Sequence, residues 1–128
     1  MSVNAIEYDF DCIYGEGIPA YYKMPVPLMQ GCVNAHQFNV RVVDRTDGIP
    51  QVCDLTGCTV TAKFMRSGLA TINITGSVSD DGKEASVLIP NTCYADACNA
   101  QIAVYVSDSV TGVTQCVLRI DCVVKNAN

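Results

Sequence analysis

The sequence predicts an all-β fold, an antiparallel sandwich or barrel of about seven or eight strands. Apolar and polar side chains alternate with a period of two in several short segments, which is typical of half-buried strands. Turn-forming residues separate these segments at intervals of about 8–12 residues, and no stretch shows a convincing helical period. The 128 residues suffice to build one core. We therefore expect a single β-sandwich domain over residues 1–128, with an extended apolar arm or loop at residues 15–31.

The first predicted strand covers residues 6–14. Its apolar phase consists of Ile6, Tyr8, Phe10, Cys12 and Tyr14. Its polar phase consists of Glu7, Asp9 and Asp11. This alternation predicts a strand with one face on a core and the other in water. An acidic stripe can bind a cation, but a solvated strand face is the commoner arrangement.

Residues 15–31, GEGIPAYYKMPVPLMQG, form the arm. Its three prolines prevent a long regular element because each lacks a backbone N–H. The segment is nevertheless more apolar than a solvated loop. Either the arm folds back over its own sheet or it lies on a partner. The candidate partner contact consists of Tyr21, Tyr22, Met24, Val26, Leu28 and Met29.

Further strands follow the arm. They are predicted at residues 37–43, 58–66, 71–78, 84–89, 99–107 and 114–124. The connection Ser79-Asp-Asp-Gly-Lys83 favours a hairpin because its glycine takes a positive φ at no steric cost. Thr59 and Thr61 are β-branched and suit the exposed side of the strand at 58–66.

The composition excludes several classes of protein. The chain is 49% hydrophobic, which argues against disorder. Eight Lys and Arg stand against thirteen Asp and Glu, for a net charge of −5, and no basic cluster is present to bind nucleic acid. The first twenty residues carry four acidic side chains and no long apolar run, so we expect no secretory signal and no membrane span.

The eight cysteines allow three arrangements. In a short secreted chain an even number would indicate disulfides, but without an export signal we expect a reducing compartment, where thiols stay free and pack as small apolar residues. Four of them fall on the apolar phases of predicted strands: Cys12, Cys58, Cys116 and Cys122. The others lie near turns or after the arm and are candidates for a disulfide or a metal: Cys32, Cys53, Cys93 and Cys98. The spacers in CDLTGC and CYADAC are at the edge of the range for zinc-binding pairs, which weakens the metal arrangement. From the expected compartment and this spacing together, packing of free thiols is favoured, disulfides come second and a metal comes third.

The sequence predicts no enzyme. A cysteine nucleophile needs a base and a group that orients it. His36, the one histidine, precedes a predicted strand, where we expect a hydrogen-bonded surface or loop residue. Asp80 and Asp81 lie in a glycine-containing turn, which accounts for them without acid–base chemistry. We therefore predict no catalytic residue, no cofactor and no metal site.

One stretch resembles a known family. DLTGCTVTAKFMRSG, residues 54–68, resembles the D-L-T-G-A-T-V-x-F motif of the N-terminal domain found in bacteriophage baseplate upper proteins and related phage structural proteins. TINITGSVSDDGKEASVLIP continues the resemblance, and NAQIAVYVSDSVTGVTQCVLRIDCVV is similar to the closing hairpin of that family. The resemblance covers Gln37 to Val124, with Cys58 standing where alanine is usual.

The resemblance implies an Ig-like β-sandwich and an architectural role in a virion. It implies an assembly or attachment module of the baseplate or tail fibre. Family members commonly continue beyond the position that corresponds to Asn128, where this sequence ends. A capsid decoration protein of the head-fibre or head-auxiliary kind is therefore an equally suitable expectation. It also implies folding roles for a turn at Asp54, Leu55, Thr56 and Gly57 and for the last hairpin at Gly112. Expected partners are other virion proteins, with no nucleic acid and no membrane, after synthesis in the cytoplasm of the host bacterium.

Edge strands favour closed assemblies, so we also expect a homo-oligomer. Two other function classes stay open. One is a carbohydrate- or receptor-binding sandwich that acts through its loops, although the tyrosines concentrate in the arm and first strand and tryptophan is absent. The other is a small metal-binding protein.

Overall fold

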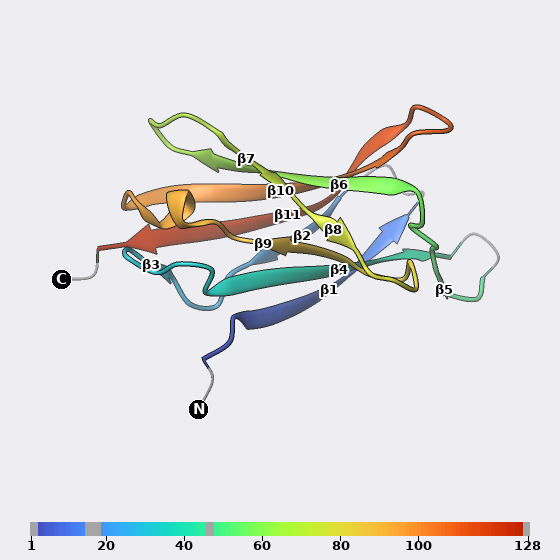
Figure 1. Ribbon diagram of the computed structural model, residues 1–128, viewed down its shortest axis with the longest axis horizontal. Helices are drawn as coiled ribbons and strands as arrows, with labels where there is room; N and C mark the ends of the chain where they lie inside the picture. Colours follow the sequence, from blue (N-terminus) through green and yellow to red (C-terminus); the bar gives the residue numbers. More distant parts are fainter. Residues whose placement is uncertain (1–2, 15–18, 46–47, 127–128) are drawn as a thin grey trace.

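The computed structural model describes residues 3–14, 19–45 and 48–126 and consists of two β-sheets packed face to face (Figure 1). Within these residues there are eleven strands and one short 3-10 helix. The strands are β1 (Ile6–Tyr14), β2 (Ala20–Lys23), β3 (Leu28–Met29), β4 (His36–Asp44), β5 (Gln51–Val52), β6 (Cys58–Arg66), β7 (Ile72–Thr75), β8 (Ser77–Val78), β9 (Ala85–Leu88), β10 (Cys98–Asp108) and β11 (Thr114–Lys125), and the 3-10 helix is η1 (Asn91–Tyr94). The predicted β-sandwich is confirmed. None of the described segments is a helix long and apolar enough to cross a membrane.

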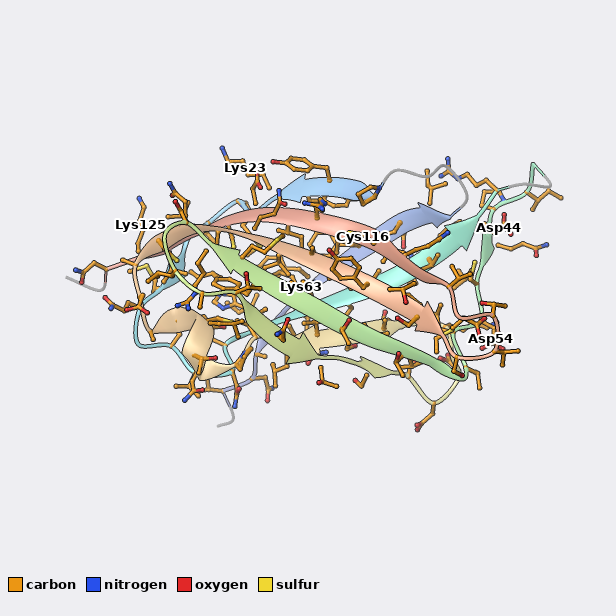
Figure 2. All side chains as sticks on the ribbon, turned by 90° about the horizontal axis from the view of Figure 1, so that it is seen from above. Lys23, Asp44, Asp54, Lys63, Cys116 and Lys125 are labelled. Atoms are coloured by element: carbon orange, nitrogen blue, oxygen red, sulfur yellow. The ribbon has the colours of Figure 1, made fainter. Side chains whose placement is uncertain are left out.

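The two sheets are mixed, whereas the sequence predicted antiparallel pairing. Sheet A has the order β1-β4-β9-β8, with β5 on the end of β4. Sheet B, which faces the viewer in Figure 2, has the order β2-β11-β10-β6-β7, with β3 farther along β11. β1 runs parallel to β4, and β2 and β3 run parallel to β11. Side-chain alternation is the same in both kinds of pair, so it gives the faces of a strand but not the direction of its neighbour.

The predicted strands agree with the structure to within about one residue at their ends, apart from one division. The segment predicted at 71–78 is split into β7 and β8 at Gly76. There the chain leaves sheet B, where β7 pairs with β6, and enters sheet A, where β8 pairs with β9. A Cβ at this position would lie 2.8 Å from the Ser86 carbonyl oxygen and 2.9 Å from Val60 Cγ1. Glycine therefore allows the backbone to pass close to both sheets.

A β-bulge in the β10–β11 hairpin changes the phase of β11. The register shifts between Val104 and Tyr105, so that Cys116 pairs with Tyr105 and Val117 is the extra residue. Val117 is buried in the core. Cys116 shares a face with Tyr105, whose ring lies 5.5 Å from the Lys63 ammonium. The predicted core position of Cys116 is therefore wrong, because a strict period of two does not anticipate an inserted residue.

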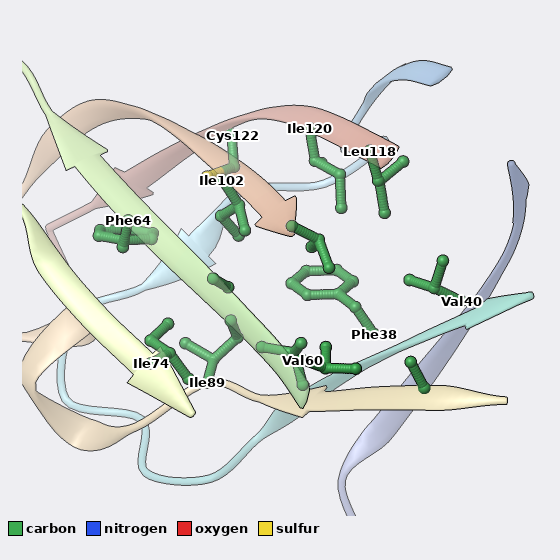
Figure 3. Packing of buried hydrophobic residues seen from close by; sticks show 14 of the residues in the cluster. Phe38, Val40, Val60, Phe64, Ile74, Ile89, Ile102, Leu118, Ile120 and Cys122 are labelled. Atoms are coloured by element: carbon green, nitrogen blue, oxygen red, sulfur yellow. The ribbon is translucent and has the colours of Figure 1, made fainter. Parts of the chain in front are cut away.

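The inner faces of the two sheets meet in one hydrophobic core (Figure 3). Phe38 and Val40 of β4 pack below Phe64 of β6 and Leu118 and Ile120 of β11, and all five are fully buried. Each such side chain contributes about 1.5–3 kcal/mol by leaving water. The apolar phases identified in the sequence therefore hold the two sheets together.

Candidate functional site: the arm and the neighbouring strands

The described part of the arm, residues 19–31, runs along the edge of sheet B. β2 and β3 both pair with β11. The amides of Met24 and Gln30 donate further hydrogen bonds to carbonyl oxygens of β11, at 2.9 and 2.8 Å. Pro25 and Pro27 lie between the two short strands, where they interrupt the ladder. The described residues thus lie on their own sheet; residues 15–18 of the predicted arm and the side chain of Tyr14 fall outside what the structure describes.

Two of the six predicted contact residues are buried in the chain itself. Leu28 is 0% exposed and Met24 is 8% exposed, and both belong to the hydrophobic core. Their side chains attach the arm to the sandwich, so Leu28 is not available to a partner and Met24 offers little surface to one. The sequence does not separate these two from their neighbours because the arm has no clean alternation.

The other four candidate residues remain on the surface. Tyr21 and Val26 are more than half exposed, and Tyr22 and Met29 are each 39% exposed. Tyr22 also spans the gap to sheet A: its ring centroid lies 4.8 Å from that of Phe10, and its hydroxyl donates to the carbonyl oxygen of Asp11 at 3.3 Å. Contact between these four side chains and a partner stays a prediction.

A groove of about 570 Å³ lies beside the arm. The arm contributes Met24, Pro25, Val26 and Pro27 to its lining. The strands and connections of sheet B contribute Met65, Ser67, Asn99, Ala100, Asp121, Cys122 and Val123. Lys23 and Lys125 line it as well, and both are labelled in Figure 2. Its walls are largely apolar.

A polar network covers the outer face of sheet A where β1 meets β4. The Asn39 amide donates to Glu7 Oε1 at 3.1 Å and to Asp9 Oδ1 at 2.9 Å. Its carbonyl oxygen accepts from Gln37 Nε2 and Ser86 Oγ, both at 2.9 Å. The hydrogen-bonding capacity of this buried side chain is therefore filled, and it links β1, β4 and β9. The alternation places Asn39 only on the polar phase of its strand, and the one signal of a special role is that asparagine is uncommon in strands.

All eight cysteines are free thiols. Cys12 and Cys122 are buried as predicted, and desolvation raises the pKa of each to about 12. Cys93, a predicted turn candidate, is instead fully buried by η1, and burial raises its pKa to about 11. Protonated buried thiols are poor nucleophiles and poor metal ligands. Among the described residues no group of three or more His, Cys, Asp or Glu side chains is placed to hold a metal ion.

The single histidine is a buried residue, where the sequence predicted a surface or loop position. His36 Nδ1 lies 2.8 Å from the hydroxyl oxygen of Tyr94, and the His36 ring stacks on Tyr8. Burial lowers the pKa of His36, which favours the neutral ring. Tyr94 is 58 residues away in the chain, so local sequence gave no signal of this pair.

The acidic residues of the turns serve the backbone. Asp54 accepts hydrogen bonds from the Thr56 amide at 2.9 Å and hydroxyl at 2.6 Å, and Gly57 follows with φ +83°. Asp81 likewise accepts from the residues around it in the β8–β9 turn. These hydrogen bonds hold the pKa of both carboxyls below the usual range. Gly112, with φ +74°, lies in the β10–β11 turn.

Comparison with known proteins gives a likeness of fold. No protein-family pattern matches the chain. No curated protein matches it. Among solved structures it is similar to the N-terminal domain of phage TP901-1 ORF48, with a TM-score of 0.52 and 10% sequence identity. The match covers 95% of this chain and 98% of that one, so the two share the arrangement of a whole sandwich.

Proposed function

We propose that this protein is a virion structural module of a bacteriophage and that it works through protein–protein contacts. The observation that carries the proposal is the likeness to the N-terminal domain of phage TP901-1 ORF48, which extends over nearly the full length of both chains. The sequence resemblance at residues 54–68 points to phage structural proteins as well. A shared fold supports several functions, so the surface must supply the rest of the argument.

The surface of the arm supports a contact role. Val26 lines an apolar groove, and Tyr21 and Met29 are exposed on the same arm. Tyrosine and methionine are enriched in the centres of protein interfaces. Leu28 and Met24 hold the arm on the sandwich. Because the contact residues are already ordered, binding a partner costs less conformational entropy than it would for a loose segment.

Within this role the protein acts as an attachment module of a baseplate or tail fibre, or as a capsid decoration. We expect it to form a homo-oligomer or a complex with other virion proteins. Sheet edges and apolar surface of this kind are commonly covered by symmetric assembly.

Purified particles of the phage that encodes the chain provide the direct test. Quantitative mass spectrometry is expected to find the chain at a fixed copy number per particle, and immunogold labelling is expected to place it on the tail or the head. Particles that are complete and infectious but contain none of the chain would overturn the proposal.

Surface variants test the arm. Val26→Ser combined with Met29→Ser removes exposed apolar area and leaves the buried anchor intact. We expect normal folding by circular dichroism but loss of oligomerisation in sedimentation velocity and loss of incorporation into particles. Ile49→Ser and Val110→Ser, at exposed apolar positions elsewhere, are the matched controls and should behave as the wild type. Normal assembly of the arm variant would place the contact on another surface.

A further inference from the structure

β1 ends sheet A, and one edge of its backbone faces away from β4. In a parallel pair, alternate residues direct both N–H and C=O toward the same neighbour. The Ile6 amide donates to the residue that precedes β4, at 2.8 Å, so the even-numbered residues of β1 bond on that side. Glu7, Asp9 and Asp11 therefore direct their backbone groups outward. The Tyr22 hydroxyl, which reaches the Asp11 carbonyl from the outer side, agrees with this direction.

The N-terminal part of this edge can accept another strand. The outward N–H and C=O groups of Glu7 and Asp9 have no hydrogen-bond partner among the described residues. On the core side of the same segment Ile6 is 55% exposed and Tyr8 is only partly buried. An edge with open backbone groups and incompletely covered apolar side chains is a template for strand addition. We call the segment Ile6–Phe10, on its side away from β4, the β1 edge.

The charges beside the β1 edge determine what can bind it. Glu7, Asp9 and Asp11 share the outer face of β1. Asp11 is paired with Arg41, with Oδ1 and Nε 2.8 Å apart. Glu7 and Asp9 accept hydrogen bonds from the neutral amide of Asn39, which leaves their negative charges uncompensated by that contact. The exposed side of the edge is therefore acidic.

A second copy of this chain does not suit the β1 edge. Two β1 strands paired along it would place the carboxylates of one copy beside those of the other on the same face. Like charges across neighbouring strands destabilise the pair. A strand with Lys or Arg at alternate positions would instead meet Glu7 and Asp9, and its intervening apolar side chains would cover Ile6 and Tyr8.

We propose that the β1 edge binds an extended segment of a different protein, one that alternates basic and apolar residues, by adding it to sheet A as a strand. This names the kind of partner for the contact function proposed above and rests on it. The two remain separable by experiment. Absence from virions with intact peptide binding would refute only the virion role, and presence in virions without peptide binding would refute only the strand addition.

The test is a nuclear magnetic resonance titration of the isotopically labelled protein with the synthetic peptide KVKVKVK. We expect the amide signals of Glu7 and Asp9 to shift and to become protected from hydrogen exchange. EVEVEVE should cause no shift, and the block isomer KKKKVVV should bind at least about tenfold more weakly because it cannot place charge and apolar side chains on opposite faces. Equal effects of EVEVEVE, or shifts confined to other strands, would overturn the proposal.

Variants separate backbone pairing from charge. Asp9→Pro removes one outward N–H and no backbone hydrogen bond to β4, although Asn39 loses one side-chain acceptor, so it should abolish binding of KVKVKVK while the core stays folded. Glu7→Gln with Asp9→Asn keeps acceptor oxygens for Asn39 and should weaken binding about tenfold, which corresponds to two surface charge pairs. Asp80→Asn, at an exposed acid in the β8–β9 turn, is the charge control and should leave binding unchanged.

Two further outcomes keep the proposal falsifiable. If Asp9→Pro does not fold, the double variant Glu7→Gln with Asp9→Asn provides the test. An unchanged affinity of that double variant for KVKVKVK contradicts the role of the acidic residues. Protection of Glu7 and Asp9 that increases with protein concentration in the absence of peptide would make a second copy the occupant and overturn the proposal.

Discussion

The two lateral sides of the sandwich are closed in different ways (Figure 1). On one side the chain passes from β7 in sheet B to β8 in sheet A through Gly76, so the sheets are joined by a continuous backbone. On the other side β1 and β2 are separate edge strands, in contact through Phe10 and Tyr22. The first side offers strands of four and two residues, and the second offers β1 with nine. Short edges resist the addition of other strands and long edges invite it, which is why both proposed contacts lie on the β1–β2 side.

The two strands of the β1–β2 side are attached by different forces. β1 depends on its ladder with β4 and on the hydrogen bonds of Asn39. The arm depends on the burial of Leu28 and Met24.

The largest effect is expected for the anchor of the arm. Leu28→Ala removes a fully buried side chain and should lower the free energy of unfolding by about 3 kcal/mol, measured by urea denaturation. Met29→Ala, at the adjacent but exposed position, is the control and should cost less than about 1 kcal/mol. Equal effects of the two changes would show that the arm is not docked in the core.

Gly76→Ala tests the opposite side. The added methyl group would lie 2.8 Å from a backbone oxygen of β9, which cannot move without disturbing sheet A. We expect a loss of about 2 kcal/mol in the free energy of unfolding, within the range for overpacking. Ser77→Ala, at the exposed neighbouring position, should stay within about 0.5 kcal/mol. A neutral Gly76→Ala would mean that the crossing between the sheets is looser than the structure shows.

The same contrast explains how much of the fold the sequence predicts. The long strands were found because alternation is dictated by the sandwich itself: β6, for example, has the predicted bounds. β2 and β3 were missed because they are short, lie among prolines and gain stability from pairing with β11, which is distant in sequence. The bulge at Val117 and the crossing at Gly76 were missed because each breaks the period of two at one residue.

The candidate site was predictable only in part. The apolar composition of the arm indicated an unusual segment, but tertiary packing decides that Leu28 faces the core and that Val26 does not. The acidic stripe of β1 was visible in the sequence as well. Its importance follows from the position of β1 at the end of a sheet, and alternation does not show which strand is at the edge.

A smaller effect is expected at alkaline pH, and it should begin on the β1 side. Burial raises the pKa of Cys12, on β1, to about 12, from 9.0 in the unfolded chain. The stabilisation from keeping this thiol neutral is complete below about pH 9 and is lost as the pH rises toward 12. By pH 10 the loss is roughly 1 kcal/mol for this thiol. Hydrogen exchange measured between about pH 9 and 11, corrected for its intrinsic rate, should show β1 opening before β7 and β8, which contain no cysteine.

Cys12→Ala provides the comparison for this pH dependence. This change removes the titrating group, so the free energy of unfolding of the variant should fall less steeply above about pH 9. At neutral pH the variant is less stable than the wild type because a buried side chain has been shortened. Cys32→Ala, at a thiol that is only partly buried and is not among the groups that act on Cys12, is the matched change. An unaltered alkaline slope in Cys12→Ala would contradict the assignment to this thiol.

The smallest effect is expected where the two edge strands meet. Tyr22→Phe keeps the ring on Phe10 and removes the hydroxyl that donates to the Asp11 carbonyl at 3.3 Å. Because this hydrogen bond is long and exposed, its loss should lower the free energy of unfolding by no more than about 0.5 kcal/mol. The change also opens one more backbone acceptor on β1, so KVKVKVK should bind about twofold more tightly, as measured by the same titration.

Tyr21→Phe separates this effect from a general loss of polarity in the arm. Tyr21 pairs with Arg119 on the outer face of sheet B, so its hydroxyl does not act on β1. Peptide affinity should then be unchanged in Tyr21→Phe. Weaker binding of KVKVKVK to Tyr22→Phe would mean that the hydroxyl helps to hold β1 in the conformation that accepts a strand, so that the two edge strands act as one contact surface. Tighter binding, the expected result, would show that β2 limits how far along β1 a partner can pair.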